Sequence, residues 1–266
     1  MFRKLSIKDL YVQLIVVNLA IFLLANIANS LGSTFFMEWF AIQLEHPFLK
    51  IWTLITAQFL HVSFGHVFSN MIFLLLFGFY AQHFFKKQSV LSIYIIGGIA
   101  GILLSLLIGK TMGQPSGVSY GASAAVFAIM GAVAFYHPEF KVNMFLIGPV
   151  KLKWIAIVLA IFGVVIDFGG NVIGSLAHLG GGLFGMYYAY MYRRKGKNIL
   201  GWLDKWFAKI GLGNETSTTK SKVTSPPMRR DPRSNSSLNL DKILDKISKS
   251  GMNSLSKEEK DFLHRS

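Results

Sequence analysis

Six apolar stretches, each close to the length of a membrane-crossing helix, constrain the fold of this 266-residue chain more than any other feature. A helix needs about 20 apolar residues to cross the hydrocarbon core of a bilayer. Hydrophobic residues make up 52% of the sequence and charged residues 15%, which is too apolar for an ordinary soluble domain. We therefore predict an all-α, polytopic membrane protein with six transmembrane helices. The stretches span about residues 11–30, 62–84, 90–109, 121–136, 152–168 and 173–192.

Lysine and arginine residues gather at the ends of these stretches, and their distribution predicts an orientation. By the positive-inside rule the four clusters that they form face the cytoplasm. The prediction is a multi-pass protein of the cell membrane, plasma or inner, with both termini in the cytoplasm. The clusters are Arg3, Lys4 and Lys8; Lys86 and Lys87; Lys141, Lys151 and Lys153; and Arg193, Arg194, Lys195 and Lys197.

The net charge of +14 has two explanations, a nucleic-acid partner or a lipid surface. The charges avoid the apolar stretches and flank them, so membrane topology and lipid phosphate account for them better. We expect the lipid bilayer as a partner and no nucleic acid.

The composition divides the chain into a membrane domain and a tail. Residues 1–197 hold the membrane domain, whose outer loop 31–60 contains FFMEWF and is expected to lie partly in the interface. Residues 198–237 combine an amphipathic segment with a flexible linker. Residues 238–266 form a short helical module, with Gly251 as a helix stop. A hairpin that packs only on itself and a cytosolic docking module both explain this extension, and its pattern identifies no partner.

Few strongly polar side chains lie within the apolar stretches, and each is informative because placing it there costs free energy. No Asp or Glu occurs between His61 and His137, so no carboxylate pair exists for an aspartyl protease. His61 and His66 are five residues apart with no acid between them, unlike the His-Glu-x-x-His of metalloproteases. We expect no metal site and no cofactor. The polar residues are His61, His66, Asn70, Ser123 and His178, with Asp167 at the end of the fifth stretch.

Ser123 and His178 lie at matching depth near the outer ends of the fourth and sixth stretches. His178, Gly181 and Gly185 share one helix face, and Phe127 lies one turn below Ser123. Small residues allow close helix approach, which a serine hydroxyl needs to reach an imidazole at about 2.6–3.2 Å. Ser123 could serve only as a small packing residue, but this combination favours a nucleophile.

His66 and Asn70 are four residues apart and therefore lie on one helix face. Their N–H groups are suited to an oxygen that becomes negative during acyl transfer. Interhelical hydrogen bonds are the alternative. The residues alone leave both interpretations open.

Three motifs occur in order on the second, fourth and sixth stretches. HVSFGHVFSN contains His-x4-His-x3-Asn, GASA (residues 121–124) contains Gly-x-Ser-x, and AHLGGGLFG contains Ala-His-x-x-Gly-x3-Gly. With these motifs the chain resembles the rhomboid intramembrane serine proteases over about residues 10–195. The resemblance implies a six-transmembrane-helix rhomboid fold and serine endopeptidase activity.

The resemblance also implies roles for individual residues. Ser123 would attack the scissile carbonyl, and His178 would act as base and then as acid. His66, Asn70 and the backbone N–H of Ser123 would form the oxyanion site, and His61 would have a structural role. Substrates would be transmembrane proteins cut near their outer ends, at a site open to the outer side. The fifth stretch and the turn 168–172 would serve as gate and cap.

Three positions depart from the family pattern. Ala124, which follows Ser123 in the motif that begins at Gly121, replaces the Gly that is usual in the family. Phe127 replaces an aromatic residue with a hydroxyl group. Thr53 replaces the Arg that often follows a Trp such as Trp52. We expect Ala124 to tighten packing and the Phe127 ring to stack on the catalytic histidine. The missing arginine leaves open how the first loop is anchored and does not affect the chemistry.

The dyad has no acid partner, so we expect packing alone to orient His178 and turnover to be slow. One rival is a catalytically inactive rhomboid-like protein that binds transmembrane clients. The other is a transporter or channel, against which the sequence shows no mid-membrane charge and no inverted repeat.

Overall fold

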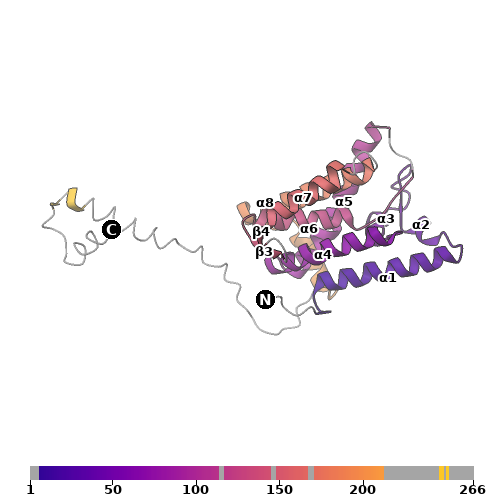
Figure 1. Ribbon diagram of the computed structural model, residues 1–266, viewed down its shortest axis with the longest axis horizontal. Helices are drawn as coiled ribbons and strands as arrows, with labels where there is room; N and C mark the ends of the chain where they lie inside the picture. The colour runs from indigo at the N-terminus through magenta and orange to yellow at the C-terminus, as the bar shows by residue number, and fades with distance from the viewer. Residues whose placement is uncertain are drawn as a thin grey trace. The chain divides into compact units, whose positions relative to one another are not determined.

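A computed structural model describes residues 6–113, 117–144, 148–166, 171–212, 246–248 and 250–251 (Figure 1). The chain divides into two compact units, residues 1–215 and 216–266. In the second unit Gly251 has φ +72°, and its N–H donates to Ile247 C=O at 2.9 Å, a geometry typical of a helix end. Several predicted features lie outside the described residues: Arg3, Lys4, Asp167, residues 168–170 of the predicted cap, linker 213–237 and most of module 238–266.

Each of the six apolar stretches contains one main helix. Three of these helices are long and apolar enough to cross a membrane, namely α1 (Leu10–Ser30), α4 (Phe64–Phe84) and α5 (Lys87–Thr111). The other three are shorter or less apolar: α6 (Ser123–Tyr136), α7 (Leu152–Ala160) and α8 (Val172–Lys195). A π-helical segment, η2 (Ile161–Ile166), continues α7.

Helix α6 forms the centre of the first unit. Every residue from 124 to 133 is buried, as expected for a helix that is apolar on all sides. Helices α8, α5 and α4 surround it, and α1 packs on α4 (Figure 1). Glycines of α8 lie directly against the α6 backbone, since a Cβ on Gly181 would be 2.1 Å from Ala124 O and one on Gly185 1.9 Å from Ala128 O. The predicted close approach of these two helices is confirmed.

The loop between α1 and α4 has its own structure. It contains α2 (Phe35–Trp39), β1 (Ile42–Gln43), α3 (Thr53–Thr56) and a 3-10 turn, η1 (Ala57–Phe59). Strand β1 pairs antiparallel with β2 (Val118–Ser119), which directly precedes the GASA motif. The loop is thereby joined to the chain that enters α6.

Other contacts anchor this loop in place of the missing arginine. The indole N–H of Trp52 donates to the Trp39 carbonyl at 3.0 Å, and the two rings stack with centroids 6.0 Å apart. The Lys50 ammonium lies 4.3 Å above the Trp39 ring. Thr53 is buried and its hydroxyl donates to Lys50 C=O at 2.6 Å.

At the opposite end of α6, the chain forms a hairpin that the apolar pattern did not predict. Strand β3 (Lys141–Met144) pairs antiparallel with β4 (Gly148–Lys151), which leads into α7. Beyond α8, helix α9 (Gly201–Lys209) packs against α5 and buries Leu203 and Phe207. Its Asp204 accepts hydrogen bonds from the hydroxyls of Ser89 and Ser92, each at 2.5 Å.

Candidate active site

A cavity of about 760 Å³ lies where α4, α6, η2 and α8 meet. Ser123, His178, His66 and Asn70 all line it, so the structure brings together the four side chains that the sequence singled out. Of the lining residues that the structure describes, none carries a formal charge. The cavity is therefore polar without being ionic. Gly181 and Gly185 lie below it, at the contact between α6 and α8.

Ser123 is the first residue of α6. The first hydrogen bond of the helix runs from Val126 N–H to Ala122 C=O at 2.9 Å. The N–H groups of Ser123 and the next two residues therefore have no acceptor within the helix. They lie at the positive end of the helix dipole, where developing negative charge is stabilised. The serine hydroxyl and a set of backbone donors thus share one position.

His178, on α8, is held on two sides. The Phe127 ring stacks on its imidazole with centroids 4.5 Å apart and planes within 6°, as predicted. Its Nδ1 lies 2.6 Å from the backbone carbonyl oxygen of Gly163 in η2. A carbonyl only accepts, so Nδ1 carries the proton and the lone pair of the neutral ring is on Nε2, as a general base requires. The expectation that packing alone orients His178 is therefore wrong.

Gly163 is the residue at this site that sequence reasoning missed. It lies at the edge of both stacked rings, and a Cβ there would be 2.4 Å from Phe127 Cζ and 3.4 Å from His178 Nδ1. Only a glycine brings its carbonyl this close to the imidazole without displacing Phe127. The available signal was a lone glycine within an apolar helix, a place where bends and π-helical turns occur.

His61 is fully buried beside the cavity rather than in its lining. Its Nε2 lies 3.2 Å from Asn70 Nδ2 and accepts from the backbone N–H of Ala122 at 3.3 Å. Since that N–H only donates, Nε2 is unprotonated and the imidazole is neutral. His61 therefore links α4 to the residue before Ser123, which supports a structural role.

The Asn70 amide is already engaged. Its Nδ2 donates to His66 C=O at 3.0 Å, one turn earlier on α4, as well as to His61. An amide group has two N–H donors, so both are used in this arrangement. Asn70 reaches an oxyanion only by exchanging one of these bonds.

Gly121 positions the His66 ring. Its φ is +121°, a left-handed conformation that favours glycine. A Cβ there would lie 2.6 Å from Cε1 and 2.8 Å from Nε2 of His66. The Gly121 N–H donates to Ala57 C=O at 2.8 Å, which fixes the turn into α6. The glycine of the GASA motif is thus required both by its positive φ and by the lack of space for a Cβ atom.

Ala124 fits beside Ser123 because of a glycine on α5. A Cβ built on Gly101 would lie 2.9 Å from the Ala124 methyl group and 2.4 Å from Ala177 O. The methyl group that departs from the usual pattern is therefore accommodated at a junction of α5, α6 and α8. Ala124 is buried, and both it and Ser123 line the cavity.

Comparison with protein families gives two matches. Residues 49–195 match the rhomboid domain, and residues 231–265 match a family of unknown function (DUF6576). The first match contains Gly163 and the four predicted site residues Ser123, His178, His66 and Asn70.

Individual relatives point the same way. The chain is 28% identical to Rhomboid-like protease 3 of Toxoplasma gondii, over 67% of this chain and 64% of that protein. It is 31% identical to RHOMBOID-like protein 12, mitochondrial, of Arabidopsis thaliana, over 67% and 57% of the two chains. For Rhomboid protein 1, mitochondrial, of Saccharomyces cerevisiae, the identity is 28% over 69% and 53%. The matched region spans between about half and two thirds of the length of these relatives.

Proposed function

The chain belongs to the rhomboid family, and from this premise we propose that it is an intramembrane serine endopeptidase that cleaves other membrane proteins in or near their transmembrane segments. One observation carries the proposal. Ser123 and His178 line a single cavity, and the Gly163 carbonyl selects the tautomer of His178 that accepts a proton at Nε2.

In the proposed mechanism, Ser123 Oγ attacks the carbonyl carbon of the scissile bond while His178 Nε2 takes its proton. The backbone N–H of Ser123 and the His66 ring stabilise the oxyanion, with Asn70 as a further donor once it exchanges a hydrogen bond. His178 then protonates the leaving amine. Water from the polar cavity hydrolyses the acyl-enzyme, with His178 again as base.

The proposed topology has six transmembrane helices, both termini in the cytoplasm and a cavity that opens on the opposite side. Helices α6 and α7 are short for membrane-crossing helices. Their lengths fit this topology if protein, and not only lipid, surrounds them at membrane depth. Helix α7 and the turn that follows are the proposed gate and cap. Two of the three relatives described above are named as mitochondrial, so the membrane in which this chain resides is part of the proposal.

A fluorophosphonate probe tests the nucleophile in purified, detergent-solubilised protein. We expect wild type to be labelled and Ser123→Ala and His178→Ala to lose labelling. Ser119→Ala is the matched control, because this hydroxyl lines the same cavity and should be dispensable. Labelling of Ser123→Ala equal to wild type would contradict the assignment. An unlabelled wild type that still binds transmembrane clients would instead identify an inactive family member.

A further inference from the structure

A second hollow, of about 390 Å³, lies between α6, α7 and α8 on the far side of the Phe127–His178 pair. Its walls are apolar along most of their length, with Ala156 and Ala160 of α7 on one side and Leu183 of α8 on the other. We call it the α7 groove. The Phe127–His178 stack lines both the α7 groove and the polar cavity and therefore separates them.

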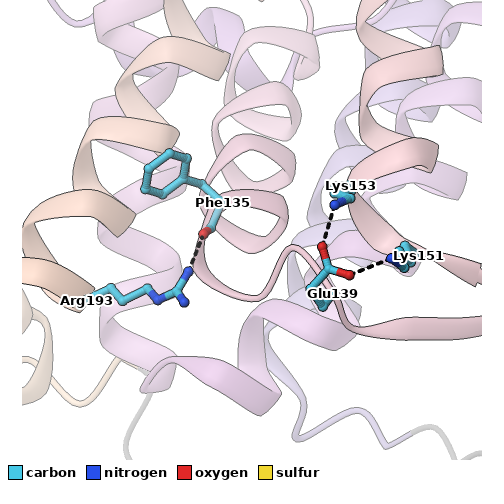
Figure 2. A network of polar contacts seen from close by, with 5 residues as sticks. All are labelled: Phe135, Glu139, Lys151, Lys153 and Arg193. Carbon is cyan, nitrogen blue, oxygen red and sulfur yellow. Dashed lines mark hydrogen bonds and ion pairs between the residues drawn. The ribbon is translucent and has the colours of Figure 1, made fainter.

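The other end of the α7 groove is cationic. Lys153 and Arg193 line it there. Glu139 forms ion pairs with Lys153 and, at 2.6 Å, with Lys151, while the Arg193 guanidinium donates to Phe135 C=O at 3.4 Å (Figure 2). Three cations against one carboxylate leave two positive charges at this end. Glu139 partly neutralises Lys153, but its side chain is 62% exposed, so the ion pair is open to solvent and a lipid phosphate would compete with the carboxylate for this lysine.

We propose that the α7 groove binds an acyl chain of one anionic glycerophospholipid, with the phosphate between Lys153 and Arg193 and the chain directed toward Phe127. The charge at one end and the apolar walls match the two parts of such a lipid. The groove volume lies within the range of small-molecule sites, about 300–1,000 Å³.

The size of the α7 groove argues against a substrate helix as its occupant. A helix with side chains is about 10 Å across and thus fills about 80 Å³ per ångström of length. The groove would hold only about one turn. A single acyl chain is narrow enough to run along it. The proposal concerns lipid binding and stands apart from the proteolytic function.

Native mass spectrometry of the delipidated full-length protein tests the proposal with phosphatidylglycerol and phosphatidylcholine of identical chains. A cation near an anionic lipid contributes about five-fold in affinity, so we expect a preference for phosphatidylglycerol of about 5- to 25-fold. Lys153→Gln/Arg193→Gln should abolish this preference. Lys141→Gln/Arg194→Gln is the matched control, because it removes the same charge from neighbouring positions outside the groove lining.

A second pair of variants tests the apolar part independently of charge. Ala160→Phe should fill the α7 groove and reduce phosphatidylglycerol retention at least five-fold. Val158→Phe changes the exposed side of the same helix and should retain phosphatidylglycerol as well as wild type does. Equal retention of both lipids, loss of preference in the control pair, or full retention in Ala160→Phe would each overturn the proposal. Competition by oleate as strong as by phosphatidylglycerol, or crosslinking of a substrate helix into the groove, would also overturn it.

Discussion

His178 Nδ1 and the Gly163 carbonyl oxygen lie 2.6 Å apart, a distance that places the backbone of η2 in the position of an acid partner. A neutral carbonyl stabilises the imidazolium less than a carboxylate does, but it fixes the same tautomer. The orientation of His178, the proposed base, therefore depends on the segment that continues α7. Any movement of this segment as a gate would change that orientation.

Gly163→Ala should lower kcat by about 10²-fold with little change in KM, because the new methyl group would displace Phe127 and move the carbonyl away from His178. Steady-state cleavage of a transmembrane substrate measures both constants. Gly182→Ala is the control, since its Cβ would find its nearest neighbour at 3.9 Å. Equal activity of the Gly163→Ala variant and wild type would remove Gly163 from the positioning of the base.

Gly121→Ala should reduce both stability and activity. The variant must hold a non-glycine residue at φ +121° and push its methyl group into the His66 ring. We therefore expect its free energy of unfolding to fall by about 1–3 kcal/mol. Thermal unfolding in detergent and cleavage assays measure the two effects. Gly65→Ala, next to His66 with nothing within 4 Å of its Cβ, should resemble wild type. A Tm for Gly121→Ala within error of wild type would contradict the prediction.

His66→Ala and Asn70→Ala should separate catalysis from packing. If each side chain donates to the oxyanion, both variants should lower kcat by about 10²–10³-fold. Asn70→Ala should also lower Tm more than His66→Ala does, because it removes a donor from buried His61. Unchanged cleavage rates in both variants would show that His66 and Asn70 have only a structural role.

Glu139 should make stability depend on pH in the acid range. Hydrogen bonds from Lys151 and then Lys153 lower its pKa from 4.5 to about 2. The unfolded chain thus binds the proton more readily, so the stabilisation is present above about pH 4.5 and lost as the pH falls toward 2.

The measurement for Glu139 is the Tm difference between wild type and Glu139→Gln. We expect a small positive difference near neutral pH, because exposed ion pairs contribute little, and a decrease to about zero as the pH falls through the acid range. Lys141→Gln serves as a control for general charge effects. A difference that stays constant across the acid range would contradict the ion pairs seen in Figure 2.

The main helices and the polar side chains Ser123, His178, His66 and Asn70 of the cavity were predictable because their signals are local. Apolar length marks α1, α4 and α5, and the spacing within HVSFGHVFSN and GASA places side chains at a shared depth. The stacking of Phe127 on His178 followed from the same positions.

The contacts made by backbone atoms were not predictable in the same way. A carbonyl such as that of Gly163 has no residue-type signature, and its approach depends on the π-helical turn of η2. The sequence also did not show that His61 accepts from Ala122 N–H, since this bond depends on how the loop folds over α4. The hairpin β3–β4 was missed because each strand has only four residues, too few for the alternation of polar and apolar residues in β3 to be distinguished from a loop.

The pairing of β1 with β2 has a consequence for where the proposed protease would cleave a substrate. Strand β1 belongs to the loop whose rings, among them Trp39 and Trp52, are exposed, and β2 ends four residues before Ser123. Exposed aromatic rings settle at the boundary between lipid headgroups and hydrocarbon. In the proposed topology the ladder would therefore set the height of Ser123 relative to the bilayer surface, and we expect a thinner or thicker membrane to shift the cleaved bond along the substrate.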